Sequence, residues 1–345
     1  AQAAQLTGDA AAAKRYFGSM LENPETRFLG LRGLLTQALR DGDETAALEY
    51  ARQAHALRPR TPWVLTSLFD LSQRCGDLET AEHALREAAR IKALPPDEAA
   101  RKRAVVLLER ALGARGRGDK GAMKLVREAH RLAPGLTPAS VMLAELLIEA
   151  GQGRKAARVL EAAWAAGAHP DLARLYLEAR PADDRIERLK RLGKLVESRP
   201  ADNESHLALA RAALDAKLWG EARRHLKDAA GPGGLDGNPS ETVCRLMAEL
   251  EEAEHGDTQA GRAWLARAAG APRDPGWVCR SCGAVAEAWS ARCGACGTFD
   301  GLTWQRPPRV QTAALEAGPA LPAVPASEQP QLAGPEATRL PAETD

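Results

Sequence analysis

Residues 38–47 read ALRDGDETAA, and the Gly-Asp dipeptide at positions 42 and 43 recurs along the chain. It also stands at residues 8–9 and 76–77, at equal spacing on either side. It returns at residues 118–119 and 256–257, and Gly151 follows Gly118 at nearly the same spacing. The flanking segments carry apolar residues at helical spacing, so each Gly-Asp predicts the turn between two helices.

A helix–turn–helix with a period of about 34 residues is the signature of the tetratricopeptide repeat. Small residues are expected five and twelve positions after the turn glycine, where the paired helices approach most closely. These positions hold Ala47, Ala54, Ala81, Ala88, Ala156 and Ala163. The large apolar core positions hold Phe17, Leu34, Leu68, Leu85, Leu143 and Leu160. We therefore predict an all-α fold, a solenoid of helical hairpins.

The pattern divides the chain into three parts. Residues 1–270 should form about seven helical pairs, of which the first is truncated, and the pair over residues 96–134 should have a lengthened first helix. Residues 271–305 lose helical periodicity and are expected to form a small metal-binding ribbon. Residues 306–345, rich in proline and alanine, are predicted to be disordered. Because Ala1 falls within a helical pattern, we expect a preceding segment that holds a membrane anchor.

Charge and residue usage limit the possible functions. The chain of 345 residues has 47 basic and 46 acidic side chains, a balance that predicts no bulk binding to nucleic acid. Its seven histidines are scattered with no pair at metal-binding spacing, so we expect surface roles for them. Cys75 and Cys244 stand alone in helical patterns and are expected to be small core residues.

The chemical motif of the chain is a pair of CxxC sequences, Cys279-x2-Cys282 and Cys293-x2-Cys296, each followed by glycine. A CxxC turn aims two thiolates at one point, and the glycine takes the backbone angle that the turn requires. Two such turns predict a closed tetrahedral site for Zn²⁺, with Fe as the alternative. Because all four ligands are sulfur, the site should be structural and not hydrolytic. Two disulfides or four free thiols are the remaining alternatives.

The first helix of each pair is expected to line a concave groove that binds a segment of a partner protein. The residues predicted to face this groove are Arg32, Thr36, Trp63, Thr66, Asp70, Gln73 and Glu145. Trp63 follows Pro62 at the start of its helix, which suits either a peptide anchor or a core residue near the helix end. Nothing in the repeats or the cysteine motif indicates an enzyme.

Three stretches resemble the alphaproteobacterial HemY family: NPETRFLGLRGLLTQALRDGD (23–43), RPADNESHLALARAALDA (199–216) and RAWLARAAGAPRDPGWVC (262–279). The resemblance covers residues 1–305 and implies an inner-membrane protein whose tetratricopeptide domain lies on the cytoplasmic side. It also implies a link to haem biosynthesis without catalysis, and enzymes of that pathway as partners. The chain departs from the family because it lacks the two N-terminal membrane helices and carries the four cysteines that many members lack.

The cysteine segment is similar to the rubredoxin-like zinc ribbon that ends the LapB proteins. It also resembles the ribbon of the DNA-repair ATPase RadA, including the core Trp289-x-x-Arg292-Cys293. We therefore expect a non-enzymatic scaffold that binds partner proteins. The first alternative is LapB-like regulation of lipopolysaccharide synthesis through a membrane protease. The second is a redox or haem-handling protein that uses the tetrathiolate.

Overall fold

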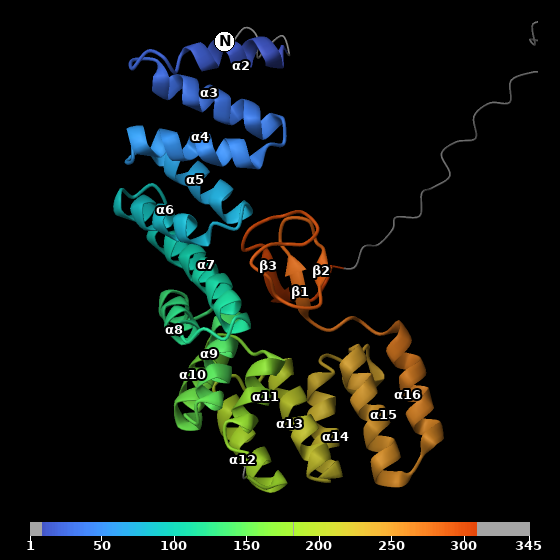
Figure 1. Ribbon diagram of the computed structural model, residues 1–345. Helices are drawn as coiled ribbons and strands as arrows, with labels where there is room; N and C mark the ends of the chain where they lie inside the picture. Colours follow the sequence, from blue (N-terminus) through green and yellow to red (C-terminus); the bar gives the residue numbers. More distant parts are fainter. Residues whose placement is uncertain (1–8, 182, 309–345) are drawn as a thin grey trace, which may run out of the picture. The chain divides into compact units, whose positions relative to one another are not determined.

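A computed structural model describes residues 9–181 and 183–308 of the chain (Figure 1). These residues form a succession of helices that ends in a three-stranded ribbon, so the predicted helical solenoid with a small C-terminal module is confirmed. The predictions for residues 1–8 and for the tail after residue 308 lie outside the described residues.

Each repeat is a pair of helices joined by a short turn. The first helices of the pairs are α3 (Arg27–Arg40), α5 (Pro62–Arg74), α7 (Pro96–Gly116), α9 (Thr137–Glu149), α11 (Pro170–Glu178), α13 (Asn203–Asp215) and α15 (Glu241–His255). The second helices are α2 (Ala10–Ser19), α4 (Glu44–Leu57), α6 (Leu78–Arg90), α8 (Ala122–Leu132), α10 (Gly153–Ala166), α12 (Arg185–Val196), α14 (Trp219–Ala229) and α16 (Thr258–Gly270). The lengthened helix expected near residue 96 is α7, which has 21 residues.

The Gly-Asp turn ends one helix and starts the next. Gly42 has φ 74°, in the left-handed region, and the Asp43 amide donates to the Ala38 carbonyl at 2.9 Å. This closure satisfies a carbonyl that the helix end leaves open. The Asp43 carboxylate then accepts the Ala46 amide at 2.9 Å and caps α4. The turn at residues 76–77 repeats both features.

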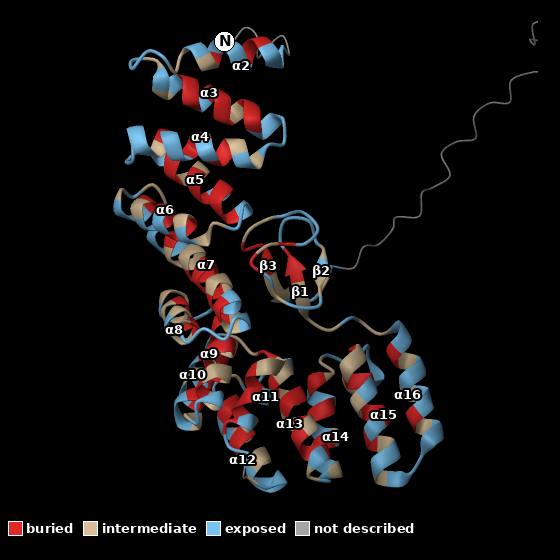
Figure 2. Cartoon of the chain, viewed as in Figure 1, coloured by how far each residue is buried: buried red, intermediate tan, exposed pale blue. Residues whose placement is uncertain are grey.

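The helices meet through the small residues that the repeat predicts. Each of the six predicted alanines is at most 5% exposed, and the six large apolar positions are likewise buried. Figure 2 shows the buried residues on the faces that neighbouring helices turn toward one another. Because alanine adds little bulk beyond the backbone, the paired helices can approach closely there.

One of the two isolated cysteines departs from expectation. Cys244 is completely buried in α15, as predicted. Cys75 is exposed, and the prediction of a core position for it was wrong. It occupies the C-cap of α5, where the chain turns away from the packed face just before Gly76.

The ribbon is a small antiparallel sheet in the order β2-β1-β3. Its strands are β1 (Gly276–Cys279), β2 (Val285–Ala286) and β3 (Leu302–Gln305). The connector before β1 is tied to α15, because the Asp274 carboxylate accepts the Thr242 amide at 2.8 Å. This contact caps the start of α15 and fixes the connector that leads into the ribbon.

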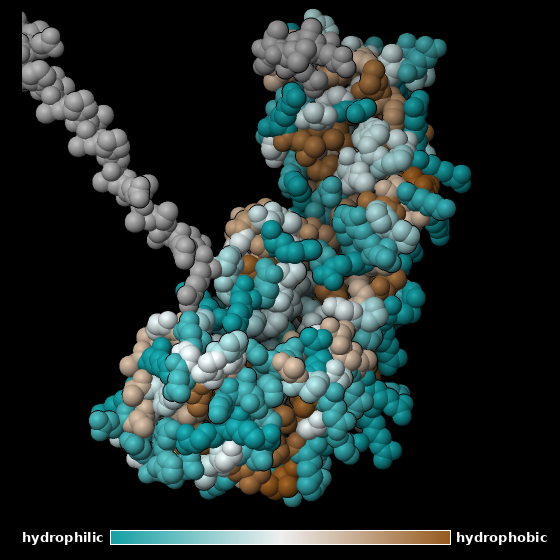
Figure 3. Space-filling view, turned by 180° about the vertical axis from the view of Figure 1, so that it is seen from behind, coloured by the Kyte–Doolittle hydropathy of each residue, from teal (hydrophilic) through white to brown (hydrophobic). Residues whose placement is uncertain are grey.

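Among the described helices, none combines the length and the apolar character that a bilayer crossing requires. The face seen from behind carries mostly hydrophilic side chains, with apolar side chains in smaller groups (Figure 3).

The turn glycine provides a direct stability test. Gly42→Ala should lower the free energy of unfolding by roughly 1–2 kcal/mol, because a Cβ is disfavoured at a left-handed φ. No atom lies within 4 Å of the place that an added Cβ would occupy, so the loss would come from the backbone alone. The measurement is chemical denaturation followed by circular dichroism.

Gly193→Ala is the matched control, because Gly193 lies inside α12, also with nothing within 4 Å of an added Cβ. It should stabilise the chain by about 1 kcal/mol through helix propensity. Equal effects of the two substitutions would show that the left-handed turn is not required.

Candidate metal centre and groove face

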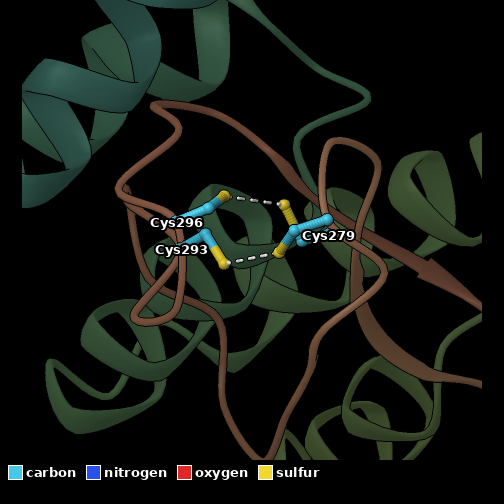
Figure 4. A group of neighbouring side chains, drawn as sticks. Cys279, Cys293 and Cys296 are labelled. Carbon is cyan, nitrogen blue, oxygen red and sulfur yellow. Dashed lines mark hydrogen bonds between the residues drawn. The ribbon is translucent and has the colours of Figure 1, made fainter.

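The four cysteines of the ribbon converge on one point. The Cys279 and Cys296 sulfurs are 3.7 Å apart, and the Cys282 and Cys293 sulfurs are also 3.7 Å apart (Figure 4). All four sulfurs lie within 4.8 Å of one another. A disulfide requires about 2.05 Å between sulfurs, so the predicted alternative of two disulfides is not formed.

The sulfur spacing fits a tetrahedral metal site. Two thiolates bound at about 2.3 Å to one tetrahedral zinc ion are about 3.8 Å apart. The observed 3.7 Å is therefore the edge of a tetrahedron that a metal ion of this size can fill. Such an ion would bring four thiolates together, neutralise part of their charge and stabilise the fold of the ribbon.

The backbone of each CxxC turn has the geometry that the sequence predicts. Gly283 and Gly297 have φ 73° and 71°, so both glycines adopt the left-handed angle. Hydrogen bonds from the hydroxyl and the backbone amide of Thr298 lower the pKa of Cys296 to about 6. The backbone amides of Cys296 and Ala295 likewise lower the pKa of Cys293. These donors favour the thiolate form that a metal ion requires.

A partly buried ion pair joins the ribbon to the solenoid. The Arg101 guanidinium of α7 donates to both oxygens of the Asp300 carboxylate, at 2.6 and 2.9 Å. Asp300 is 7% exposed and has φ 52°, and its amide donates to the Ala291 carbonyl at 2.8 Å. The two-point contact fixes the angle of the ribbon as well as its distance from α7.

Aromatic contacts continue this junction on both sides. Phe69 of α5 meets Phe299 edge to face, with ring centroids 5.3 Å apart. The His169 ring, at the start of α11, has its centroid 4.2 Å from that of Trp304 and 5.5 Å from that of Trp277. The ribbon therefore lies on the face made by α5, α7, α9 and α11, which we call the groove face (Figure 1).

Charged residues of the groove face surround Arg292, which extends from the ribbon. Partial desolvation raises the pKa of Asp70, while Lys102, Arg74 and Arg292 act in the opposite direction. Burial also raises the pKa of Glu109, against the effect of Arg292. One oxygen of Glu109 and one nitrogen of Arg292 are buried without a hydrogen-bond partner in the described structure. This part of the junction is less well satisfied than the Arg101–Asp300 pair.

The residues predicted to face the groove divide between two regions. Arg32 and Asp70 are exposed, Gln73 is buried, and the remaining four, Thr36, Trp63, Thr66 and Glu145, are partly buried. Trp63 packs against Phe28, with centroids 5.4 Å apart, and the Arg32 guanidinium lies 5.4 Å from the Trp63 centroid. Glu145 instead lines a pocket beside the ribbon.

That pocket, which we call the junction pocket, has a volume of about 290 Å³. It lies between the groove face and the ribbon, and its apolar wall consists of Leu108, Leu112, Pro138, Val141, Met142, Trp277 and Trp289. His169 also lines it, and the His169 Nδ1 accepts the Asp171 amide at 3.2 Å. Burial lowers the pKa of His169, so the neutral ring carries its proton on Nε2.

Two groups of side chains that contain histidine could not be predicted from the sequence spacing. His206 and His225 are 19 positions apart, yet their Nδ1 atoms lie 3.3 Å from each other across α13 and α14. His55 shares a hydrogen bond of 2.6 Å with Glu87 across α4 and α6. The expectation of isolated surface histidines was therefore wrong for these residues, because helix pairing joins positions that no short motif connects.

The Arg101–Asp300 pair can be tested by amide hydrogen exchange. Arg101→Ala should weaken the attachment of the ribbon by about 2 kcal/mol, because it leaves a buried carboxylate without its donors. Amides over residues 291–300 should then exchange at least tenfold faster. Arg131→Ala is the control, since Arg131 pairs with Glu128 on the exposed surface of α8. Equal exchange in both variants would mean that the pair does not hold the ribbon.

Comparisons with known proteins agree with this architecture. Residues 1–177 match the family model described as a tetratricopeptide repeat. The chain is 32% identical over 253 residues to the probable magnetosome protein Mms48 of Magnetospirillum gryphiswaldense, covering 72% of this chain and 54% of that protein. The chain thus spans about half the length of this curated relative.

Two solved structures match parts of the chain with low TM-scores. A tetratricopeptide repeat protein from Parabacteroides merdae has a TM-score of 0.34 at 15% identity, over 71% of this chain and 93% of that chain. The C-terminal part of a repeat protein from Cytophaga hutchinsonii has a TM-score of 0.39 at 12% identity, over 69% and 93%. Since the family model matches more than half of the 345 residues, the chain belongs to the tetratricopeptide repeat family.

Proposed function

We propose that this chain is a non-enzymatic scaffold that binds a partner protein in the junction pocket. Tetratricopeptide repeats are protein-interaction modules, and their partners dock on surfaces formed by successive repeats. The observation that carries the proposal is the pocket itself, in which an apolar wall meets His169 and Trp289. Few polar groups set among aromatic and aliphatic side chains are typical of a site that anchors one side chain of a ligand.

The occupant that fits best is an extended segment with one large apolar side chain. Leu112 is 46% exposed, so apolar surface is available for such a side chain to cover. His169 Nε2 and Trp289 Nε1 have no hydrogen-bond partner within the described part of the chain. Both can donate, so backbone carbonyls of a bound segment are suitable acceptors after a small movement of the rings.

Partner capture with paired leucine variants tests the pocket. Leu112→Asp should reduce capture of partners at least tenfold, because it places a charge where an apolar side chain would be buried. Leu39→Asp is the control, since Leu39 is 43% exposed on α3 and lies away from the pocket. Both residues are exposed, so neither substitution should unfold the chain.

The same capture experiment distinguishes the junction pocket from the N-terminal groove residues as the binding surface. Loss of capture with Trp63→Ala or Asp70→Ala, but not with Leu112→Asp, would move the site to the N-terminal groove residues. Unchanged capture by all three variants would remove the groove face from consideration.

We further propose that the scaffold acts at the inner membrane, on the cytoplasmic side, with enzymes of late haem biosynthesis as partners. The support is the HemY resemblance, which also implies an N-terminal anchor. The first alternative is LapB-like regulation of lipopolysaccharide synthesis through a membrane protease, supported by the similar ribbon. The magnetosome is an alternative setting that rests on the name of the 32% identical relative. Capture from native membranes with the full-length protein would distinguish these partners.

The metal of the ribbon is proposed to be zinc in a structural role. The four sulfurs suit Zn²⁺, although Fe in the same ligand set would support the redox or haem-handling alternative. Purified chain should contain one equivalent of zinc by mass spectrometry and no visible absorption band. Visible absorption with an equivalent of iron would support the redox alternative.

Cys293→Ser should abolish the tightly held equivalent of metal at the four cysteines, because it removes one of four converging sulfurs. Cys75→Ser is the control, since Cys75 is exposed and lies outside the four-cysteine cluster. Full metal content in the Cys293 variant would disprove the tetrathiolate site.

A further inference from the structure

We infer that His206, His225 and Asp228 form a second metal site, for a divalent transition ion of the zinc class. The site lies on the α13–α14 hairpin, outside the ribbon and outside the groove face as defined by α5, α7, α9 and α11. It requires neither the proposed scaffold function nor the four cysteines. One nitrogen from each imidazole and one carboxylate oxygen would be the ligands.

The distances between the ligand atoms suit one small ion. The two Nδ1 atoms are 3.3 Å apart. Two imidazole nitrogens bound at about 2.05 Å to one tetrahedral ion are also about 3.3 Å apart. Asp228 Oδ2 is 3.9 Å from His206 Nδ1, and all three ligand atoms lie within 4.8 Å of one another. The carboxylate would have to move closer to the two imidazoles to reach ligand distance.

The hairpin itself arranges these ligands. His225 and Asp228 are three positions apart on α14, so their side chains lie on the same face of the helix. His206 comes from the first turns of α13, which packs antiparallel to the last turns of α14. Leu226 and Ala222 are completely buried in the adjoining core and hold the two helices in this register. The ligands therefore come from a rigid scaffold.

The surroundings favour a neutral ligand at His225. His225 is 8% exposed, and the Arg224 guanidinium lies beside its ring. Metal binding requires the unprotonated nitrogen, which a neutral ring offers. Without metal, Arg224 donates to His225 Nε2 at 3.2 Å, which leaves the ring proton on Nδ1 for a hydrogen bond to His206.

Metal binding would change this tautomer. Nδ1 would coordinate the ion, and the ring proton would move to Nε2, where Arg224 could no longer donate. The Glu221 carboxylate lies 3.8 Å from His225 Nε2 and can accept that proton in a hydrogen bond after a small movement. A carboxylate behind a ligating histidine is the usual support of such sites. Arg224 is exposed and already pairs with Glu221, so it can remain on that carboxylate.

A surface depression gives the ion a route to the site. His206 and Asp228 line an open depression of about 620 Å³ together with Lys227 and Gly231. The remaining coordination positions would be filled by water from this side. Lys227 and Arg224 place positive charge near the ion, and one ligand is exposed. The second site should therefore bind more weakly than the four cysteines.

The test is zinc titration of the full chain whose four-cysteine site has already been filled with one equivalent. Isothermal titration calorimetry should detect a second equivalent in the wild type. His206→Ala and Asp228→Asn should weaken this second binding at least tenfold and leave the first equivalent unchanged. Circular dichroism would check that the helices persist, since both side chains reach the surface and should tolerate substitution.

His55→Ala is the matched control. His55 and His83 contact different oxygens of Glu87, at 2.6 and 3.5 Å, so they flank a carboxylate and do not converge on an ion. This variant should keep both equivalents. The inference would be overturned by wild type that binds one equivalent only, or by a second equivalent that survives in His206→Ala. Loss in the His55 variant alone would assign the second ion to the other cluster.

Discussion

The arrangement of the repeats depends on the turn between paired helices. In this turn, a residue with a left-handed backbone angle ends the first helix, and a carboxylate caps the start of the second. Gly42 and Asp43 supply these in succession, so one helix closes and the next opens within two residues. The short connection keeps the paired helices antiparallel and adjacent. Close packing follows because alanines stand at the points of nearest approach. This constraint accounts for the recurrence of Gly-Asp along the chain.

The ribbon adds a second level of organisation. Its two-point contact with Arg101 joins residues 199 positions apart and brings Phe299 and Trp304 onto the groove face. If a metal ion holds the ribbon together, the loss of that ion would also alter this face and the junction pocket. In the proposed function, metal content and partner binding would therefore be coupled through the position of the ribbon.

The cysteine cluster could be predicted from the local sequence, whereas the contacts between elements far apart in the chain could not. The CxxC spacing placed four thiols within one short segment, and the structure brings them to 3.7 Å. The residues predicted to face the groove came from repeat positions, which indicate the face of the helix on which a side chain lies but not what covers it. The His206–His225 pair could not be predicted, because a spacing of 19 residues brings two side chains together only after the two helices have paired.

By itself, the sequence determined the helical pairs, their turns, the buried small residues and the four-cysteine motif. These depend on interactions within about one repeat, such as capping, helical periodicity and tight-turn geometry. Only the tertiary structure decided that the ribbon lies against α5 and α7, that Cys75 is exposed and that His206 meets His225. Those outcomes depend on contacts between segments far apart in the chain, which leave no periodic signal in the sequence.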